Sequence, residues 1–229
     1  LGAGDNDRAQ NTAAFAFWGC VSVTLLYSVA AYLFEDMFMN LLGGSDPEVH
    51  AAAIQYLQVT VIIGGLGTSL NALLAHLVRS EGYAAQASIG VAMGGVLNIA
   101  LDPLFMFVIL PKGQEVLGAG IATSLSNLIA TAYFLFLMYS KREKSVLCLK
   151  PKYGMFCFGI PRDVLATGLP ACLMTLCENI SYAVLDNLMS LCGTAMQAGI
   201  GVAKKVNMLA HCIVRGMTQG VLPLIAFNF

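Results

Sequence analysis

Six long runs of mainly apolar residues dominate this sequence and limit the folds that it can adopt. They cover approximately residues 12–34, 51–77, 84–110, 118–139, 164–191 and 195–227. An α-helix rises 1.5 Å per residue, so about 20 apolar residues cross the hydrocarbon core of a bilayer. Backbone polar groups inside lipid must pair with one another, which favours helices over strands. We therefore predict an all-α, polytopic membrane helix bundle with about six transmembrane helices.

The composition also indicates a chain that spends most of its length in lipid. Hydrophobic residues make up 58% and charged residues 11% of the 229 positions, and this charged share is less than half that of a typical soluble domain. The seven cysteines form no C-x-x-C pair and lie mostly in the apolar runs, where cysteine behaves as a small hydrophobic residue. We therefore expect membrane lipids as surroundings, no nucleic-acid partner, no disulfides and no metal site.

Basic residues concentrate in the loops on one side of the predicted bundle. Six of the twelve lie in the segment 140–163, namely Lys141, Arg142, Lys144, Lys150, Lys152 and Arg162. The segment 35–50, which we expect to be a loop, holds four acidic residues and no Lys or Arg. The positive-inside rule places the segment 140–163 in the cytoplasm. Anionic lipid would also attract these charges, but topology explains them more simply.

Two polar residues and a proline interrupt the apolar run 84–110. Asn98 and Asp102 are four residues apart, so a helix places both side chains on one face. A carboxylate inside a spanning helix costs roughly 2.5–3.5 kcal/mol, so Asp102 should face a partner or a polar cavity. Pro103 has no N–H and should kink the helix and free a carbonyl group. These groups suit a proton or cation site; a structural kink with Asp102 paired locally is the alternative.

Charged residues also interrupt the last two apolar runs, which should form an antiparallel hairpin. Glu178 and Asp186 lie in the fifth run, and Lys204 and Lys205 lie in the sixth. Counted from the connecting turn, the lysines fall at a depth between the two acids, so an acid–lysine pair is geometrically reasonable. We favour a functional, proton-transferring role for Glu178 and a structural role for Asp186.

Glycines recur at helical spacing in the second and third runs, where small residues would let helices approach closely. These glycines are Gly64, Gly65, Gly67, Gly90, Gly94 and Gly95. We predict tight helix–helix contacts at these positions rather than a binding role.

Signatures of soluble enzymes are missing from the sequence. It contains no G-x-S-x-G, no H-E-x-x-H, no Walker loop and no dinucleotide-binding fingerprint after a strand. A membrane-embedded enzyme would need a clustered metal or nucleophile set, which the sequence does not display. We predict a protein that is not an enzyme and has no cofactor, with H⁺ or Na⁺ as the coupling ion for any transport.

Five motifs, taken in order and spacing, resemble the multidrug and toxic compound extrusion (MATE) transporters. They are Leu1-Gly-Ala-Gly-Asp-Asn-Asp-Arg-Ala9, Asn98-Ile-Ala-Leu-Asp102-Pro103-Leu-Phe, Gly118-Ala-Gly-Ile-Ala-Thr123, Gly168-Leu-Pro170 with Glu178, and Gly220-Val-Leu-Pro223-Leu-Ile-Ala-Phe-Asn228. The resemblance covers the whole chain and implies part of a twelve-helix, two-lobe transporter. It also implies a multi-pass protein of the bacterial plasma membrane.

On this map, residues 1–139 resemble helices 3–6, the second part of the N-terminal lobe. Residues 140–163 would form the basic cytoplasmic inter-lobe loop, and residues 164–229 resemble helices 7–8 of the C-terminal lobe. We expect the chain to be a fragment whose partners include the missing helices of its own parent. Half a transporter cannot alternate access, so we expect no transport by the chain alone.

The resemblance also implies which residues couple an ion to transport. Asn98, Asp102 and Thr123 match the N-terminal lobe site of the family, which further uses an acid outside this chain. Glu178 stands eight residues after Pro170, where some members carry a coupling glutamate. Lys204 and Lys205 match no family-wide feature and, with Asp186, are possible charges of the transport cavity.

The function implied by the resemblance is a proton- or sodium-coupled antiporter that exports organic cations or drugs. An alternative is a lipid-linked oligosaccharide flippase of related architecture, which a more cationic cavity around Lys204 and Lys205 would favour. Export assays on dye cations and on lipid-linked substrates distinguish the two.

Overall fold

The structure is a computed structural model that describes residues 4–41, 47–143, 145–151, 153–157 and 159–228. Within these ranges the chain is helical and contains no strand, as the sequence predicts. Residues 1–3 of the first motif, and Lys144 and Lys152 of the basic segment, lie outside the described residues.

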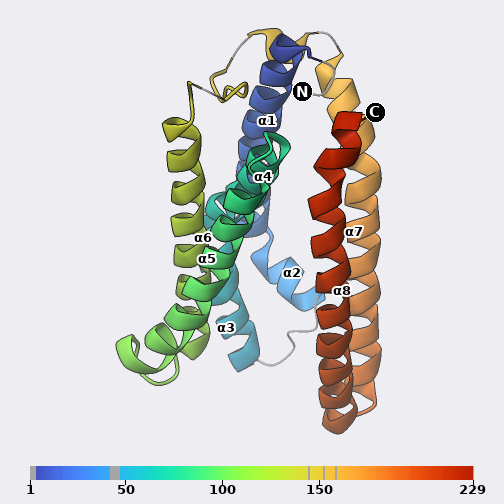
Figure 1. The fold of residues 1–229 in the computed structure, drawn as a ribbon. Helices are drawn as coiled ribbons and strands as arrows, with labels where there is room; N and C mark the ends of the chain where they lie inside the picture. Colours follow the sequence, from blue (N-terminus) through green and yellow to red (C-terminus); the bar gives the residue numbers. More distant parts are fainter. Residues whose placement is uncertain (1–3, 42–46, 144, 152, 158, 229) are drawn as a thin grey trace. The chain divides into compact units, whose positions relative to one another are not determined.

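Long helices dominate the chain (Figure 1). The α-helices are α1 (Asn6–Leu33), α2 (Glu35–Leu41), α3 (Pro47–Leu57), α4 (Gly65–Ser80), α5 (Ala84–Pro103), α6 (Glu115–Ser140), α7 (Ile160–Leu191) and α8 (Thr194–Asn228). Other helical turns are the π-helices η1 (Gln58–Ile63) and η2 (Leu104–Ile109) and the 3₁₀-helix η3 (Tyr153–Phe156). The connection between α6 and α7 is longer than the turns between the other helices.

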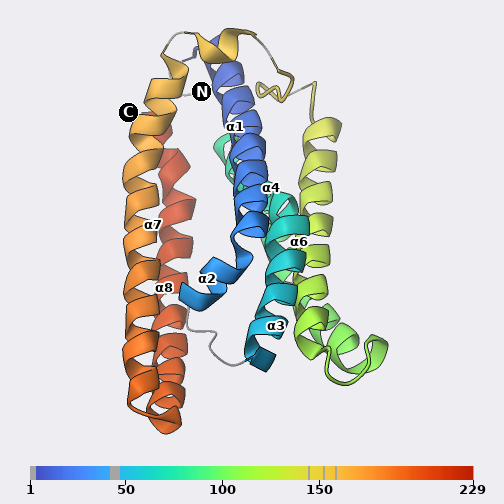
Figure 2. The same ribbon diagram turned by 180° about the vertical axis from the view of Figure 1, so that it is seen from behind.

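The chain forms two compact units, residues 3–160 and residues 161–229. Unit 1 contains α1 to α6, and unit 2 is the hairpin of α7 and α8, whose helices run side by side in both views (Figures 1 and 2). The division falls within the segment 140–163. The assignment of residues 1–139 and 164–229 to two transporter lobes stays a prediction.

Four helical segments of the described chain are long and apolar enough to cross a membrane. They are Asn6–Leu33, Ala84–Ile109, Glu115–Ser140 and Ile160–Met189, and the bent pair His50–Ile63 and Gly65–Ser80 gives a fifth if it counts as one span. The sixth span that the sequence predicts, residues 195–227, corresponds to α8. The helix α8 forms over 35 residues but is not among these apolar spans, and it carries Lys204, Lys205 and Arg215.

The segment 35–50, expected as a loop, is partly helical. The helix α1 ends at Leu33 with Phe34 as its C-cap, and α2 begins at once with Glu35 and Asp36, two acids that suit the positive end of the helix dipole. Glu35 accepts a hydrogen bond from Gln58 Nε2 at 3.0 Å, and Asp36 lies 3.3 Å from His50 Nε2. Part of this acidic composition therefore belongs to local helix structure.

The core of unit 1 is built around α4, which packs against α1, α5 and α6. Its buried cluster joins Leu74 and Val78 of α4 to Phe134 of α6. A Cβ atom on Gly90 of α5 would lie only 2.4 Å from the Phe134 ring, so the predicted tight contact is confirmed there. At Gly95 it is wrong, because no neighbouring heavy atom lies within 4 Å of the position of its Cβ atom.

The first half of the basic segment is fastened to unit 1. One carboxylate oxygen of Glu81, the residue that follows α4, accepts hydrogen bonds from Ser145 Oγ at 2.5 Å and from the backbone N–H groups of Val146 and Leu147 at 3.0 and 3.1 Å. The indole Nε1 of Trp18 donates to the carbonyl oxygen of Leu149 at 3.1 Å. Residues 145–149 therefore form a fixed strap across the end of the helices.

Candidate functional site

The structure brings together Asn98, Asp102 and Thr123. Asn98 and Asp102 lie one turn apart on α5, with Asn98 Nδ2 3.4 Å from Asp102 Oδ1. The same amide nitrogen lies 3.3 Å from Thr123 Oγ1 on α6. One amide group thus links a carboxylate to a hydroxyl group from the neighbouring helix.

This cluster faces the interior of unit 1 rather than the surrounding medium. All three side chains are half-buried, whereas Ile99, the next residue on α5, is 74% exposed. The helix therefore presents its polar face to α6 and an apolar residue to the outside. This orientation is the one expected for a carboxylate that would be costly to place in lipid.

Pro103 marks a change of helix geometry directly beside Asp102. The α5 helix gives way after Pro103 to the π-helix η2, in which Leu110 N donates to the carbonyl oxygen of Phe105 at 3.3 Å. Because Pro103 has no N–H, the carbonyl of Ile99 lacks its ordinary α-helical donor. The backbone around the carboxylate is thus irregular at the position that the sequence predicts.

A polar network that sequence reasoning did not find extends from Thr123 to α4. The Thr123 carbonyl oxygen accepts from Asn127 Nδ2 at 3.0 Å, and Asn127 Oδ1 accepts from Asn71 Nδ2 of α4, also at 3.0 Å. The side-chain oxygen of Asn71, Oδ1, is buried and has no hydrogen-bond partner among the described residues. The sequence offered one indication of this network, because Thr123 and Asn127 are four residues apart and therefore lie on one face of a helix.

A second irregular backbone lies on the other side of α6. The pair His50–Ile63 and Gly65–Ser80 is bent by 51°, and the bend falls at Gly64, where Gly64 N donates to the Val59 carbonyl at 2.9 Å. That carbonyl also accepts from Ser124 Oγ at 2.9 Å. A Cβ atom on Gly64 would lie 2.2 Å from Ser124 Oγ, so only glycine allows this close approach.

In unit 2 the acid that pairs with lysine is Asp186. Lys204 Nζ forms an ion pair with Asp186 Oδ1 across the hairpin and lies 3.4 Å from the Tyr182 carbonyl oxygen. It also sits over the Tyr182 ring, 5.2 Å from the centroid. Glu178, two turns earlier on α7, is half-buried, and Lys205 is exposed. The structure thus joins Asp186 to Lys204 and leaves Glu178 and Lys205 outside this pair.

The described residues contain no group of three or more His, Cys, Asp or Glu side chains that could hold a metal ion. The Asp102 carboxylate can accept a proton, and the side-chain oxygens of Asn98, Asp102 and Thr123 can contact a monovalent cation. The geometry defines a protein of apolar helices with the half-buried carboxylate of Asp102 as its candidate ion site.

Known transport proteins resemble this chain in sequence. The MatE family model matches residues 1–104. The multidrug export protein MepA of Staphylococcus aureus (strain bovine RF122 / ET3-1) is 27% identical over the whole chain, and MepA of Staphylococcus haemolyticus (strain JCSC1435) is 25% identical. The chain is therefore similar to MatE proteins over residues 1–104 and to multidrug export proteins of the MepA type over its whole length. It spans about half, 49%, of the length of these curated relatives.

Solved structures show the same fold. An outward-facing multidrug resistance MATE family transporter of the MOP superfamily superposes with a TM-score of 0.85 and 24% identity, over 99% of this chain and 49% of the other. A MOP superfamily transporter from Pyrococcus furiosus Vc1, described as having a binding pocket of reverse polarity, gives a TM-score of 0.82 at 24% identity, over the same shares. The relatives and structures named above are described as multidrug export proteins and as MATE or MOP superfamily transporters, which does not favour the flippase alternative.

Proposed function

We propose that the protein works as a cation-coupled antiporter that exports organic cations, with Asp102 as the group that binds the coupling proton or sodium ion. Two observations support this proposal: the similarity to MATE transporters and the position of Asn98, which holds Asp102 and Thr123 in one cluster. The second observation carries the choice of residues, because an intramembrane acid held by polar partners is a functional site by default.

The proposed mechanism rests on a change of charge. When Asp102 binds a proton or Na⁺, the cluster becomes neutral or screened, and the hydrogen bonds from Asn98 change in strength. A conformation that exposes the cluster to one side of the membrane then binds the ion better than the other conformation does. Such differential affinity shifts the equilibrium between inward- and outward-open states.

We further propose that the remaining charges of unit 2 take part in forming the transport cavity. The Asp186 carboxylate offsets the charge of Lys204. A positively charged substrate in the cavity would therefore be repelled by Lys205 but much less by Lys204. Glu178 stays the second candidate for ion coupling. The complete transporter would need further helices, as its relatives are about twice as long, and would lie in the bacterial plasma membrane.

The test is ethidium export from proteoliposomes that contain the complete transporter, driven in turn by a proton gradient and by a sodium gradient. We expect Asp102→Asn to abolish export under the coupling gradient, because the amide cannot be protonated. Asp36→Asn, which neutralises an exposed acid beside His50, is the matched control and should export normally. Unchanged export by Asp102→Asn would remove Asp102 from the mechanism, and the gradient that drives the wild type identifies the coupling ion.

A further inference from the structure

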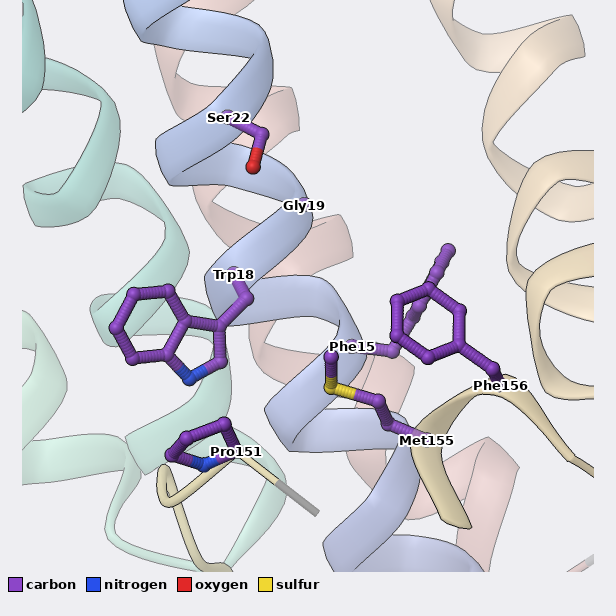
Figure 3. A pocket seen from close by; sticks show the side chains of 7 residues that line it. All are labelled: Phe15, Trp18, Gly19, Ser22, Pro151, Met155 and Phe156. Atoms are coloured by element: carbon purple, nitrogen blue, oxygen red, sulfur yellow. The ribbon is translucent and has the colours of Figure 1, made fainter. Parts of the chain in front are cut away.

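A cavity of about 470 Å³ lies between one face of α1 and residues 151–156, which follow the strap and include η3 (Figure 3). Its apolar walls come from both sides: Phe15, Trp18 and Gly19 belong to α1, and Pro151, Met155 and Phe156 belong to the segment 151–156. Figure 3 shows the Trp18 ring beside Pro151 and the Phe15 ring beside Phe156. The cavity belongs entirely to unit 1 and is separate from the cluster around Asp102.

The walls of this cavity are held in place by contacts of their own. The Trp18 indole is hydrogen-bonded to the strap through the Leu149 carbonyl. The Phe15 and Phe156 rings meet edge to face, with centroids 6.0 Å apart. Gly154 lies so close to Asn11 on α1 that a Cβ atom would come within 2.9 Å of the Asn11 amide. The cavity is therefore preformed rather than created by a ligand.

The apolar lining of the cavity and the basic residues near it in the sequence suit an amphiphilic molecule with an anionic headgroup. The lining is apolar except for Ser22 and the backbone, and α1 is one of the helices suited to cross the membrane. Exposed Lys150 directly precedes Pro151 of the lining, in a segment that carries half of all Lys and Arg residues of the chain. A lysine uses its aliphatic stem along apolar surface and keeps its ammonium group in water, at the level of lipid headgroups.

We propose that this cavity binds an anionic phospholipid, with part of an acyl chain between Trp18 and Phe156 and the phosphate paired with Lys150. The proposal is independent of the antiport mechanism. It differs from the general attraction of a basic loop to a membrane, because it requires a defined cavity and one defined lysine. A single basic residue near an anionic membrane surface corresponds to about a fivefold change in association.

Trp18 makes this cavity directly observable, because it is the single tryptophan of the chain. The full chain is reconstituted in nanodiscs, and Trp18 fluorescence is measured with increasing fractions of brominated phosphatidylglycerol or brominated phosphatidylcholine. We expect phosphatidylglycerol to quench Trp18 at lower mole fractions than phosphatidylcholine does. Equal quenching by both lipids would contradict the proposal, and absent quenching would show that something other than lipid covers the cavity.

Two variants and a control separate the cavity from unspecific attraction. Lys150→Gln should lower the preference for phosphatidylglycerol about fivefold. Gly19→Leu should fill the cavity and reduce quenching by both lipids; no heavy atom lies within 4 Å of the added Cβ atom, so the helix should fold normally.

Lys141→Gln removes the same charge from the same segment, at a lysine stacked over the Tyr83 ring, and should leave the preference for phosphatidylglycerol unchanged. A Lys141→Gln effect as large as that of Lys150→Gln would overturn the assignment of Lys150.

Discussion

Asn98 on α5 places its side-chain amide nitrogen 3.3 Å from the hydroxyl oxygen of Thr123 on α6. The same nitrogen lies 3.4 Å from the Asp102 carboxylate, so the contact connects the candidate ion-binding acid to a second helix. A small displacement of α6 against α5 would therefore change the surroundings of Asp102. This relationship makes Thr123 the most informative position for testing the site without changing its charge.

We predict that Thr123→Val lowers ethidium export about tenfold, whereas Thr123→Ser keeps most of it. Valine has the shape of threonine but no hydroxyl group, so the Asn98 amide loses its contact with α6 and keeps only the one with Asp102, at a cost of about 1–3 kcal/mol. Export rates in proteoliposomes at several concentrations of the coupling ion measure the effect. If both variants export like the wild type, Thr123 has only a packing role.

The two glycines of α5 that differ in their surroundings should respond oppositely to alanine. Gly90→Ala places a methyl group against the fully buried Phe134 ring, and such overpacking should destabilise the chain by about 1–3 kcal/mol. Gly95→Ala adds the same methyl group in open space on the same helix and should stabilise the helix by up to about 1 kcal/mol. Thermal unfolding in detergent measures both. Equal effects would show that Gly90 is not in tight contact.

The strap should open when Glu81 loses its carboxylate. Glu81→Ala removes the acceptor of three hydrogen bonds from residues 145–147, which we expect to favour local opening by about 1–3 kcal/mol. The half-buried thiol of Cys148 lies in this strap, so its labelling by a maleimide should become faster by a factor of about five or more. Glu143→Ala removes an exposed acid from the same segment and should not change the rate.

Local patterns in the sequence predict most of the helices and the central pair of the site. The i, i+4 spacing alone places Asn98 and Asp102 on one face of α5, and the cost of a charge in lipid indicates that this face is turned inward. Thr123 could be joined to them only through the resemblance to a family, because it lies on another helix, 25 residues away from Asn98. The structure shows the contact between the Asn98 amide and the Thr123 hydroxyl group.

The features that sequence reasoning missed all depend on how distant helices fit together. Asn71 and Asn127 are 56 residues apart, and Glu81 and Ser145 are 64 residues apart. No periodicity within one helix reports such contacts. The bend at Gly64 was missed for the same reason, because it is fixed by Ser124 of α6. The glycine pattern indicated close packing but could not distinguish Gly90 from Gly95, which point to different sides of one helix.

The hairpin of unit 2 should depend on Asp186 and Lys204 as a pair. Asp186→Ala leaves the Lys204 ammonium group without its carboxylate in a segment that we expect to lie in the membrane, where an isolated charge costs roughly 2.5–3.5 kcal/mol. The double variant Asp186→Ala/Lys204→Ala removes both charges. We therefore expect the double variant to unfold at a higher denaturant concentration than Asp186→Ala alone, with a coupling energy of about 0.5–3 kcal/mol from the double-mutant cycle.

Unfolding of the full chain in mixed micelles by sodium dodecyl sulfate measures this cycle. Lys205→Ala is the matched control, because Lys205 is the exposed neighbour of Lys204 and lies outside the ion pair. A cycle between Asp186 and Lys205 should give no coupling energy. Additive effects of Asp186→Ala and Lys204→Ala would mean that their contact contributes nothing to the hairpin, and Lys204 would then stand as an uncompensated charge beside any cationic substrate.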